Sequence, residues 1–206
     1  ELYESDISEE VLAKFPHLAG YTALVLREGD AAEAKGLLKN QLAVSMTLGD
    51  KIVDATSLQI PGVLDFLYAD AASRETLGVS WQDGTPTAKL WTPTAQNVKL
   101  HVFDTADAND DILSGGIDTG HLALDMNYDD TTGIWSLMGD SSWKNKYYLY
   151  EVTVYAPSTQ QIETNIVTVP YSVALSINST KCHIVNLEGA DLKPDGWDNL
   201  QKAGMA

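Results

Sequence analysis

The sequence predicts a mainly β protein, in which a small α+β domain is followed by an immunoglobulin-like antiparallel β-sandwich. Three observations support this fold class. After position 77, short runs of apolar, β-branched and aromatic residues recur at roughly 8–12-residue spacing, which is typical of sandwiches. Turn residues such as Asp83-Gly84 separate these runs. Before position 77, strand-like runs alternate with short helical segments instead.

The first domain is expected to span residues 1–76. Its strand-like runs lie at 21–27, 41–48 and 51–58, and Gly49-Asp50 joins the last two as a hairpin turn. Asp30 is suited to cap a short helix over residues 31–39, although Gly36 lowers the helix propensity there. Pro61 at a first helical turn predicts a second helix over residues 61–70.

The second domain is expected to span residues 77–188 and to consist of strands. Apolar residues alternate at 98–102 and at 122–126, so each of these strands has one buried and one wet face. The longest strand is expected over 146–156, with Tyr148, Tyr150, Val152 and Val154 on one face. Residues 189–206 are expected to form a linker that leaves the domain.

Charge and cysteine content limit the possible partners. The 206-residue chain has 29 acidic and 13 basic residues, which gives a formal net charge of −16. Nucleic-acid binding needs Lys and Arg to neutralise phosphates, so no nucleic-acid partner is expected, and anionic membranes are disfavoured likewise. A neutral glucan meets no such obstacle. The single cysteine, Cys182, excludes an internal disulfide.

The sequence contains no recognised catalytic or metal-binding motif. There is no G-x-S-x-G, H-E-x-x-H or C-x-x-C pattern. Asp125, Asn127 and Asp129 have the spacing of a calcium loop, but Asp130 stands where Gly is required and Ser136 where Glu is required. We therefore favour a solvated hairpin turn here, and we expect no cofactor and no metal.

The aromatic residues are the remaining functional candidates. The chain has five tryptophans and nine tyrosines. The apolar C–H face of a sugar ring stacks on flat Trp and Tyr rings, which makes Trp81, Trp143 and Tyr147 candidate carbohydrate-binding residues. Aromatic residues at alternating strand positions more often belong to the core, so this second interpretation stays open for each of them.

Several collinear segments carry a family resemblance. Residues 77–81, 90–98, 147–152 and 170–179, together with Trp143, are similar to the family-48 carbohydrate-binding module that precedes the catalytic barrel in glycoside hydrolase family 13. Residues 41–44 and 58–65 resemble the small domain before that module. Residues 192–198 resemble the segment that leads into the barrel of pullulanases and limit dextrinases, the starch debranching enzymes.

The resemblance implies that this chain is the non-catalytic N-terminal part of a debranching enzyme. The barrel, with its nucleophilic Asp and acid/base Glu, would hydrolyse α-1,6 branches by a retaining mechanism. This chain would pack against that barrel and support it, with Tyr171 and Trp197 as docking residues. The alternative is an independent module that binds starch or other α-glucans, such as maltooligosaccharides or limit dextrins, through exposed aromatic rings.

The sequence departs from the glucan-binding members of the family at three places. Val169 replaces the usual acidic residue before Pro-Tyr, the loop at 105–108 has no Trp, and Leu149 stands where a Lys is expected. We therefore expect the family's glucan site to be lost.

The cellular location is expected to follow the type of enzyme. A plastid fits the plant or algal type, and a secreted or cell-surface location fits the bacterial type. Because the chain opens on Glu1 without an initiator Met or a basic start, we expect a processed or excised segment.

Overall fold

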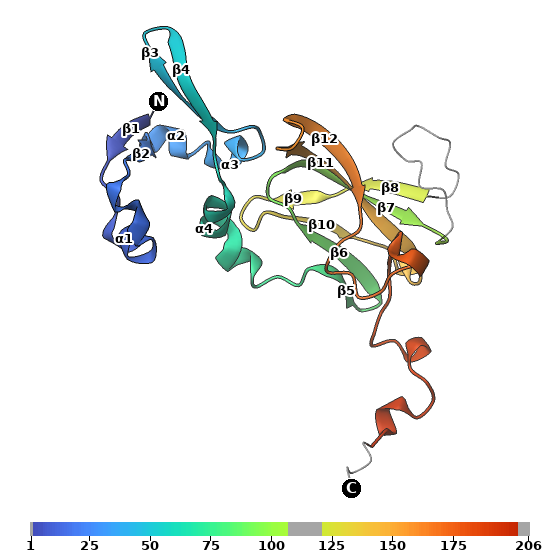
Figure 1. Cartoon of the computed structure of the whole chain (residues 1–206). Helices are drawn as coiled ribbons and strands as arrows, with labels where there is room; N and C mark the ends of the chain where they lie inside the picture. Colours follow the sequence, from blue (N-terminus) through green and yellow to red (C-terminus); the bar gives the residue numbers. More distant parts are fainter. Residues whose placement is uncertain (1, 107–120, 202–206) are drawn as a thin grey trace. The chain divides into compact units, whose positions relative to one another are not determined.

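The computed structural model describes residues 2–106 and 121–201. Contacts divide the chain into two compact units, Glu1–Leu58 and Gln59–Ala206 (Figure 1). The domain boundaries expected after positions 76 and 188 stay predictions. By contacts, the division falls earlier than position 76, because helix α4 (Pro61–Ala72) groups with the second unit. In the described ranges, no helix combines the length and hydrophobicity needed to cross a membrane.

The N-terminal unit is a small α+β structure, as the sequence predicts. Strand β1 (Leu2–Ser5) pairs antiparallel with β2 (Ala23–Leu26), and β3 (Ala43–Leu48) pairs with β4 (Lys51–Ser57) across the turn that begins at Gly49. The remaining elements are α1 (Glu9–Lys14), the 3₁₀ helix η1 (Pro16–Gly20), α2 (Glu28–Ala31) and α3 (Ala34–Leu37). The single helix expected over 31–39 is therefore wrong, since two one-turn helices replace it.

The N-terminal unit has very little core. Among its described residues, only Leu38 is buried. Met46, Leu48 and Ile52 on the β3–β4 hairpin are exposed instead. An isolated two-stranded hairpin is at best marginally stable in water, because few apolar contacts offset its lost conformational entropy. Apolar contacts within the unit therefore stabilise it little.

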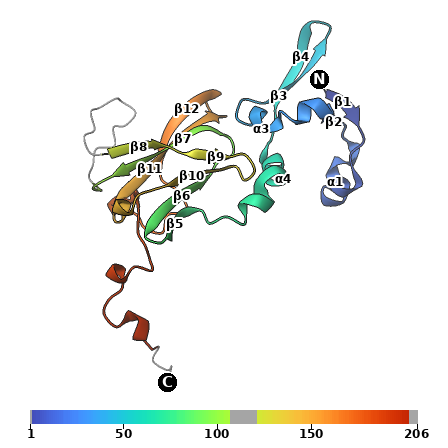
Figure 2. The same ribbon diagram turned by 180° about the vertical axis from the view of Figure 1, so that it is seen from behind.

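The second unit is an antiparallel sandwich of two sheets, which face each other in Figures 1 and 2. The four-stranded sheet has the order β5-β6-β10-β9, and the other has the order β12-β11-β7-β8, with β13 paired to the start of β11. The strands are β5 (Gly78–Gln82), β6 (Thr85–Trp91), β7 (Ala95–Phe103), β8 (His121–Asp125), β9 (Asn127–Asp129), β10 (Ile134–Met138), β11 (Tyr147–Ala156), β12 (Gln161–Val167) and β13 (Cys182–His183). The immunoglobulin-like sandwich predicted from sequence is confirmed.

The core of the sandwich lies between the sheets and is centred on β11. Tyr148, Tyr150 and Val152 point inward from this strand, and Val98 and Leu100 do so from the neighbouring β7. The alternation that the sequence shows at 146–156 is therefore confirmed as the inward face. Each fully buried apolar side chain of this size contributes about 1.5–3 kcal/mol.

Tyr68 on helix α4 contacts the sandwich. Tyr68 is buried, and its hydroxyl lies 3.4 Å from that of Tyr128 on β9. Gly133, at φ +69°, lets the ring approach, because a Cβ there would lie 3.1 Å from Tyr68 and 2.7 Å from Pro93. This contact joins α4 to the sandwich, in agreement with the grouping of α4 in the second unit.

The difference in core content predicts how the two units fold when separated. Residues 59–201 expressed alone should show a cooperative thermal transition, since this range holds every described buried residue except Leu38. Residues 1–58 alone should show no cooperative transition. Circular dichroism and calorimetry of both fragments test this, and a cooperative transition for residues 1–58 would contradict it.

The hydroxyl of Tyr150 predicts a stabilising substitution. It is fully buried and has no hydrogen-bond partner among the described residues, and burial raises its pKa well above the ordinary value. Tyr150→Phe removes an unpaired polar group and should raise the free energy of unfolding by about 1 kcal/mol. Tyr68→Phe is the matched control and should lower it, because the buried Tyr68 hydroxyl lies 3.4 Å from that of Tyr128. Urea denaturation measures both, and a loss of stability in Tyr150→Phe would contradict the prediction.

Candidate functional site

Trp81 lies on the edge strand β5 with its polar atom already engaged. Its indole N–H donates a 2.8 Å hydrogen bond to the carbonyl oxygen of Val185. The ring is partly buried and packs against the sandwich core. Trp81 therefore holds the chain segment after β13 against the sandwich, and only part of its ring is accessible.

A groove of about 340 Å³ lies beside Trp81. Val79, Val173, Val185 and Leu187 form its apolar lining together with the indole, and Ser80, Asp83, Gly84, Asn186 and Glu188 complete it. The lining contains no Lys, Arg or His, so the groove does not suit an anion. Its composition suits an apolar side chain or a neutral polyol.

Trp143 is a core residue, which corrects its prediction as a stacking ring. It is only 6% exposed and belongs to the inter-sheet cluster. It ends the 3₁₀ helix η2 (Ser141–Trp143), and Gly139 lies against the face of its ring, where any Cβ would clash. A sugar cannot stack on a ring that is covered in this way.

Tyr147 stands on the other sheet, at the start of β11. Its ring stacks on that of His183 with centroids 4.5 Å apart and planes 10° apart. His183 in turn lies with Nε2 3.2 Å from the carbonyl oxygen of Asn145. One face of Tyr147 is thus occupied by protein. The structure does not bring Trp81, Trp143 and Tyr147 together as one platform.

A second hollow surrounds the position where the resemblance expects a Lys. Leu149, which is buried, lines it together with Ile166, Val167, Thr168 and Thr180. None of these side chains is aromatic or charged, so the hollow offers neither a stacking ring nor a cation. Of the loop at 105–108, positions 107 and 108 lie outside the described residues.

The two predicted docking residues are both exposed. Tyr171 lies where the chain crosses Gly78, and its carbonyl oxygen would be 2.7 Å from a Cβ at that glycine. Trp197 belongs to the 3₁₀ helix η5 (Trp197–Asn199) in the segment that leaves the sandwich. A 2.7 Å ion pair between Lys144 and Asp191 ties this segment to the sandwich.

The sequence interpretation missed three exposed apolar side chains that follow Tyr171. Val173, Leu175 and Ile177 all face solvent. The signal that could have indicated them is the alternation of large apolar and small residues in the run YSVALSI at 171–177.

Two ionisable groups of the sandwich, His101 and Cys182, are buried. His101 is buried, with Nε2 2.9 Å from a carboxylate oxygen of Glu151, and burial lowers the pKa of its imidazole. Cys182 is also fully buried and accepts a hydrogen bond from the backbone N–H of Val169. Neither group faces one of the hollows described above, so neither is placed for acid–base or nucleophilic chemistry there.

The candidate calcium-loop residues lie on strands, since Asp125 ends β8 and Asn127 and Asp129 belong to β9, and the hairpin turn expected here begins only at Asp130. The carboxylate of Asp129 accepts hydrogen bonds from the Thr131 backbone N–H at 2.9 Å and the Thr132 hydroxyl at 2.8 Å. These bonds lower the pKa of Asp129 and occupy its oxygens. In the part of the chain that the structure describes, no cluster of three or more His, Cys, Asp or Glu suits a metal.

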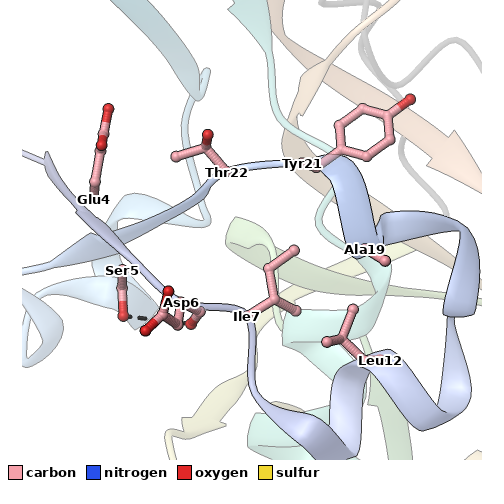
Figure 3. Close-up of a pocket in the computed structure, with 8 residues that line it drawn as sticks. All are labelled: Glu4, Ser5, Asp6, Ile7, Leu12, Ala19, Tyr21 and Thr22. Carbon is pink, nitrogen blue, oxygen red and sulfur yellow. Dashed lines mark hydrogen bonds between the residues drawn. The ribbon is translucent and has the colours of Figure 1, made fainter.

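The N-terminal unit contains an open pocket of about 530 Å³ where β1 leads into α1 (Figure 3). Ile7, Leu12 and Ala19 form its apolar side, and Glu4, Ser5, Asp6, Tyr21 and Thr22 complete the lining. Figure 3 shows Glu4 and Asp6 pointing in different directions. Paired catalytic carboxylates must face a common bond, so this pair does not suit glycoside hydrolysis.

Comparisons with protein families match both units. Residues 1–65 match the Pullulanase N2 domain, and residues 76–172 match carbohydrate-binding module 48, the isoamylase N-terminal domain.

Known pullulanases match nearly the whole chain. The pullulanase of Klebsiella pneumoniae is 36% identical over 97% of this chain, and pullulanase 1, chloroplastic, of Arabidopsis thaliana is 33% identical over 97%. This chain spans only 17% and 19% of their lengths. Among solved structures, PulA of Klebsiella oxytoca matches with a TM-score of 0.84 and 36% identity, over 98% of this chain and 18% of that one.

The fold, the two family matches and the collinear relatives agree with each other. Residues 1–65 therefore match the Pullulanase N2 domain family and residues 76–172 match the carbohydrate-binding module 48 family, and the chain as a whole is similar to a portion of known pullulanases.

Proposed function

We propose that this chain is the non-catalytic N-terminal part of a pullulanase or limit-dextrinase type enzyme, and that it packs against and supports a family-13 catalytic barrel. The barrel would hydrolyse α-1,6 branches of starch-derived glucans. The relatives that match this chain are about five times longer, at 17–19% coverage, which leaves room for such a barrel.

The observation that carries this proposal is the state of the predicted stacking rings. Trp143 is buried in the core, Trp81 is bound to the Val185 backbone, and Tyr147 is stacked on His183. A glucan platform needs exposed aromatic faces that lie side by side. Exposed Tyr171 and Trp197 instead suit contact with another protein surface, because aromatic residues are enriched at interfaces.

The alternative, an α-glucan-binding module, has one supporting observation. The groove beside Trp81 combines part of an indole face with the polar residues Asp83, Asn186 and Glu188, which can bind hydroxyls. A solved relative, the Klebsiella pneumoniae pullulanase, was crystallised in complex with maltotriose. The location, a plastid in the plant type or the cell exterior in the bacterial type, stays a prediction.

The two candidate functions differ in their prediction for glucan binding. Isothermal titration of the chain with maltoheptaose and β-cyclodextrin should give no detectable heat at millimolar ligand. The contrary result is sub-millimolar glucan binding. In that case Trp81→Ala should abolish the binding, and the control variant Trp197→Ala should retain it. That result would establish the groove as a glucan site and make the supporting role secondary.

The supporting role predicts a coupled unfolding transition in the intact polypeptide that carries this chain and a barrel. Trp197→Ala should lower the melting temperature of that polypeptide, because the ring would lose its contact with the barrel. In the 206-residue chain alone the same change should have no effect, because Trp197 is exposed there. Met138→Ala, at another exposed position, is the control. An unchanged transition in the intact polypeptide would contradict docking through Trp197.

A further inference from the structure

The segment at 171–177 presents its large apolar side chains to solvent, which is the reverse of an ordinary half-buried strand. In such a strand the large apolar residues face the core and the small polar ones face water. Here Tyr171 is 39% exposed, Val173 61%, Leu175 47% and Ile177 87%. Of the small residues between them, Ser176 is buried and Ser172 and Ala174 are partly buried.

Hydrogen bonds on the inner side hold this segment in place. The Ser176 hydroxyl accepts a 2.9 Å bond from the Lys181 backbone N–H, and the two residues are also joined by a 2.9 Å bond between their backbones. The carbonyl oxygen of Ala174 accepts bonds from the His183 N–H at 2.9 Å and the Ser172 hydroxyl at 2.7 Å. The four apolar side chains are thus held on an ordered backbone, so a partner has little left to order on binding.

The exposed apolar side chains of residues 171–177 form a row that continues into the groove beside Trp81. Val173 lines that groove together with Val185 and Leu187. Because Trp81 fixes Val185 by a 2.8 Å hydrogen bond, the chain leaves the sandwich next to Val173. Any domain attached beyond this exit is tethered close to the row, at an effective concentration on the order of millimolar.

We propose that Tyr171, Val173, Leu175 and Ile177 form a docking strip on which the catalytic domain of the same polypeptide rests. This inference rests on the proposed function, and it adds the surface and the apolar character of the contact.

Other occupants fit the docking strip less well. A second copy of the chain would bring a second net charge of −16, and four side chains cover far less than the ~800 Å² per partner that a stable complex of free proteins buries. A glucan needs hydroxyl partners and aromatic faces, whereas three of the four side chains are aliphatic. The observations favour an apolar surface on a domain that belongs to the same polypeptide.

Thiol labelling tests the docking strip. The only native cysteine of the chain, Cys182, is fully buried, so Val173→Cys and Ile177→Cys each introduce one accessible thiol. Maleimide labelling rates are compared between the 206-residue chain and the intact polypeptide with its catalytic domain, after subtraction of the unsubstituted protein. Met138→Cys, at an exposed position at the end of β10, is the matched control.

Both strip thiols should label about tenfold more slowly in the intact polypeptide, as expected for a surface that is covered nine-tenths of the time. The control thiol should label equally in both forms. If both strip thiols label at equal rates in the two forms, and the intact polypeptide still unfolds in one coupled transition, the docking strip is wrong and the proposed function stands. If the labelling rates are equal and this chain unfolds independently of the catalytic domain, both the docking strip and the proposed function are wrong. Labelling that slows as the concentration of the 206-residue chain rises would assign the strip to a second copy and overturn the inference.

Discussion

The pairing of β11 with its neighbours is the constraint on which the rest of the sandwich depends. This strand pairs with β7 on one side and β12 on the other, and its first residues also pair with β13. Side chains alternate with a period of two, so a slip of one residue would turn Tyr148, Tyr150 and Val152 out of the core. The same register places Cys182 opposite Tyr148, and Cys182 bridges to Leu175. The position of the docking strip therefore follows from the register of β11.

The sandwich could be predicted from sequence because its signals are local. The alternation at 98–102 lies within β7, and Gly49 and Pro61 mark the hairpin turn and the start of α4 where they were expected. The N-terminal unit was less predictable. Strand β1 is four residues long and pairs with a strand about twenty residues away, so nothing in its own sequence distinguishes it from a loop. The helix expected over 31–39 is interrupted after Ala31, in a stretch that Gly36 already weakens.

The candidate site could be predicted only in part, because alternation does not say which face of a segment is covered. Trp143 was a reasonable stacking candidate by residue type, and its burial depends on Gly139, whose lack of a side chain lets the ring approach. In the run at 171–177, the orientation is decided by hydrogen bonds that Ser176 and Ala174 accept from the backbone N–H groups of Lys181 and His183, which no local pattern reveals. Tyr171 and Trp197 are exposed, and their docking role stays a prediction.

The inverted run at 171–177 also has a consequence for biosynthesis. Chains are made from the N-terminus at roughly 5–20 residues per second, and domains fold as they emerge. The sandwich can fold once its last strands have emerged, and from then on the apolar side chains of Val173, Leu175 and Ile177 face solvent. The net charge of −16 then acts as a temporary protection, since neighbouring nascent chains repel each other before their exposed rows can meet.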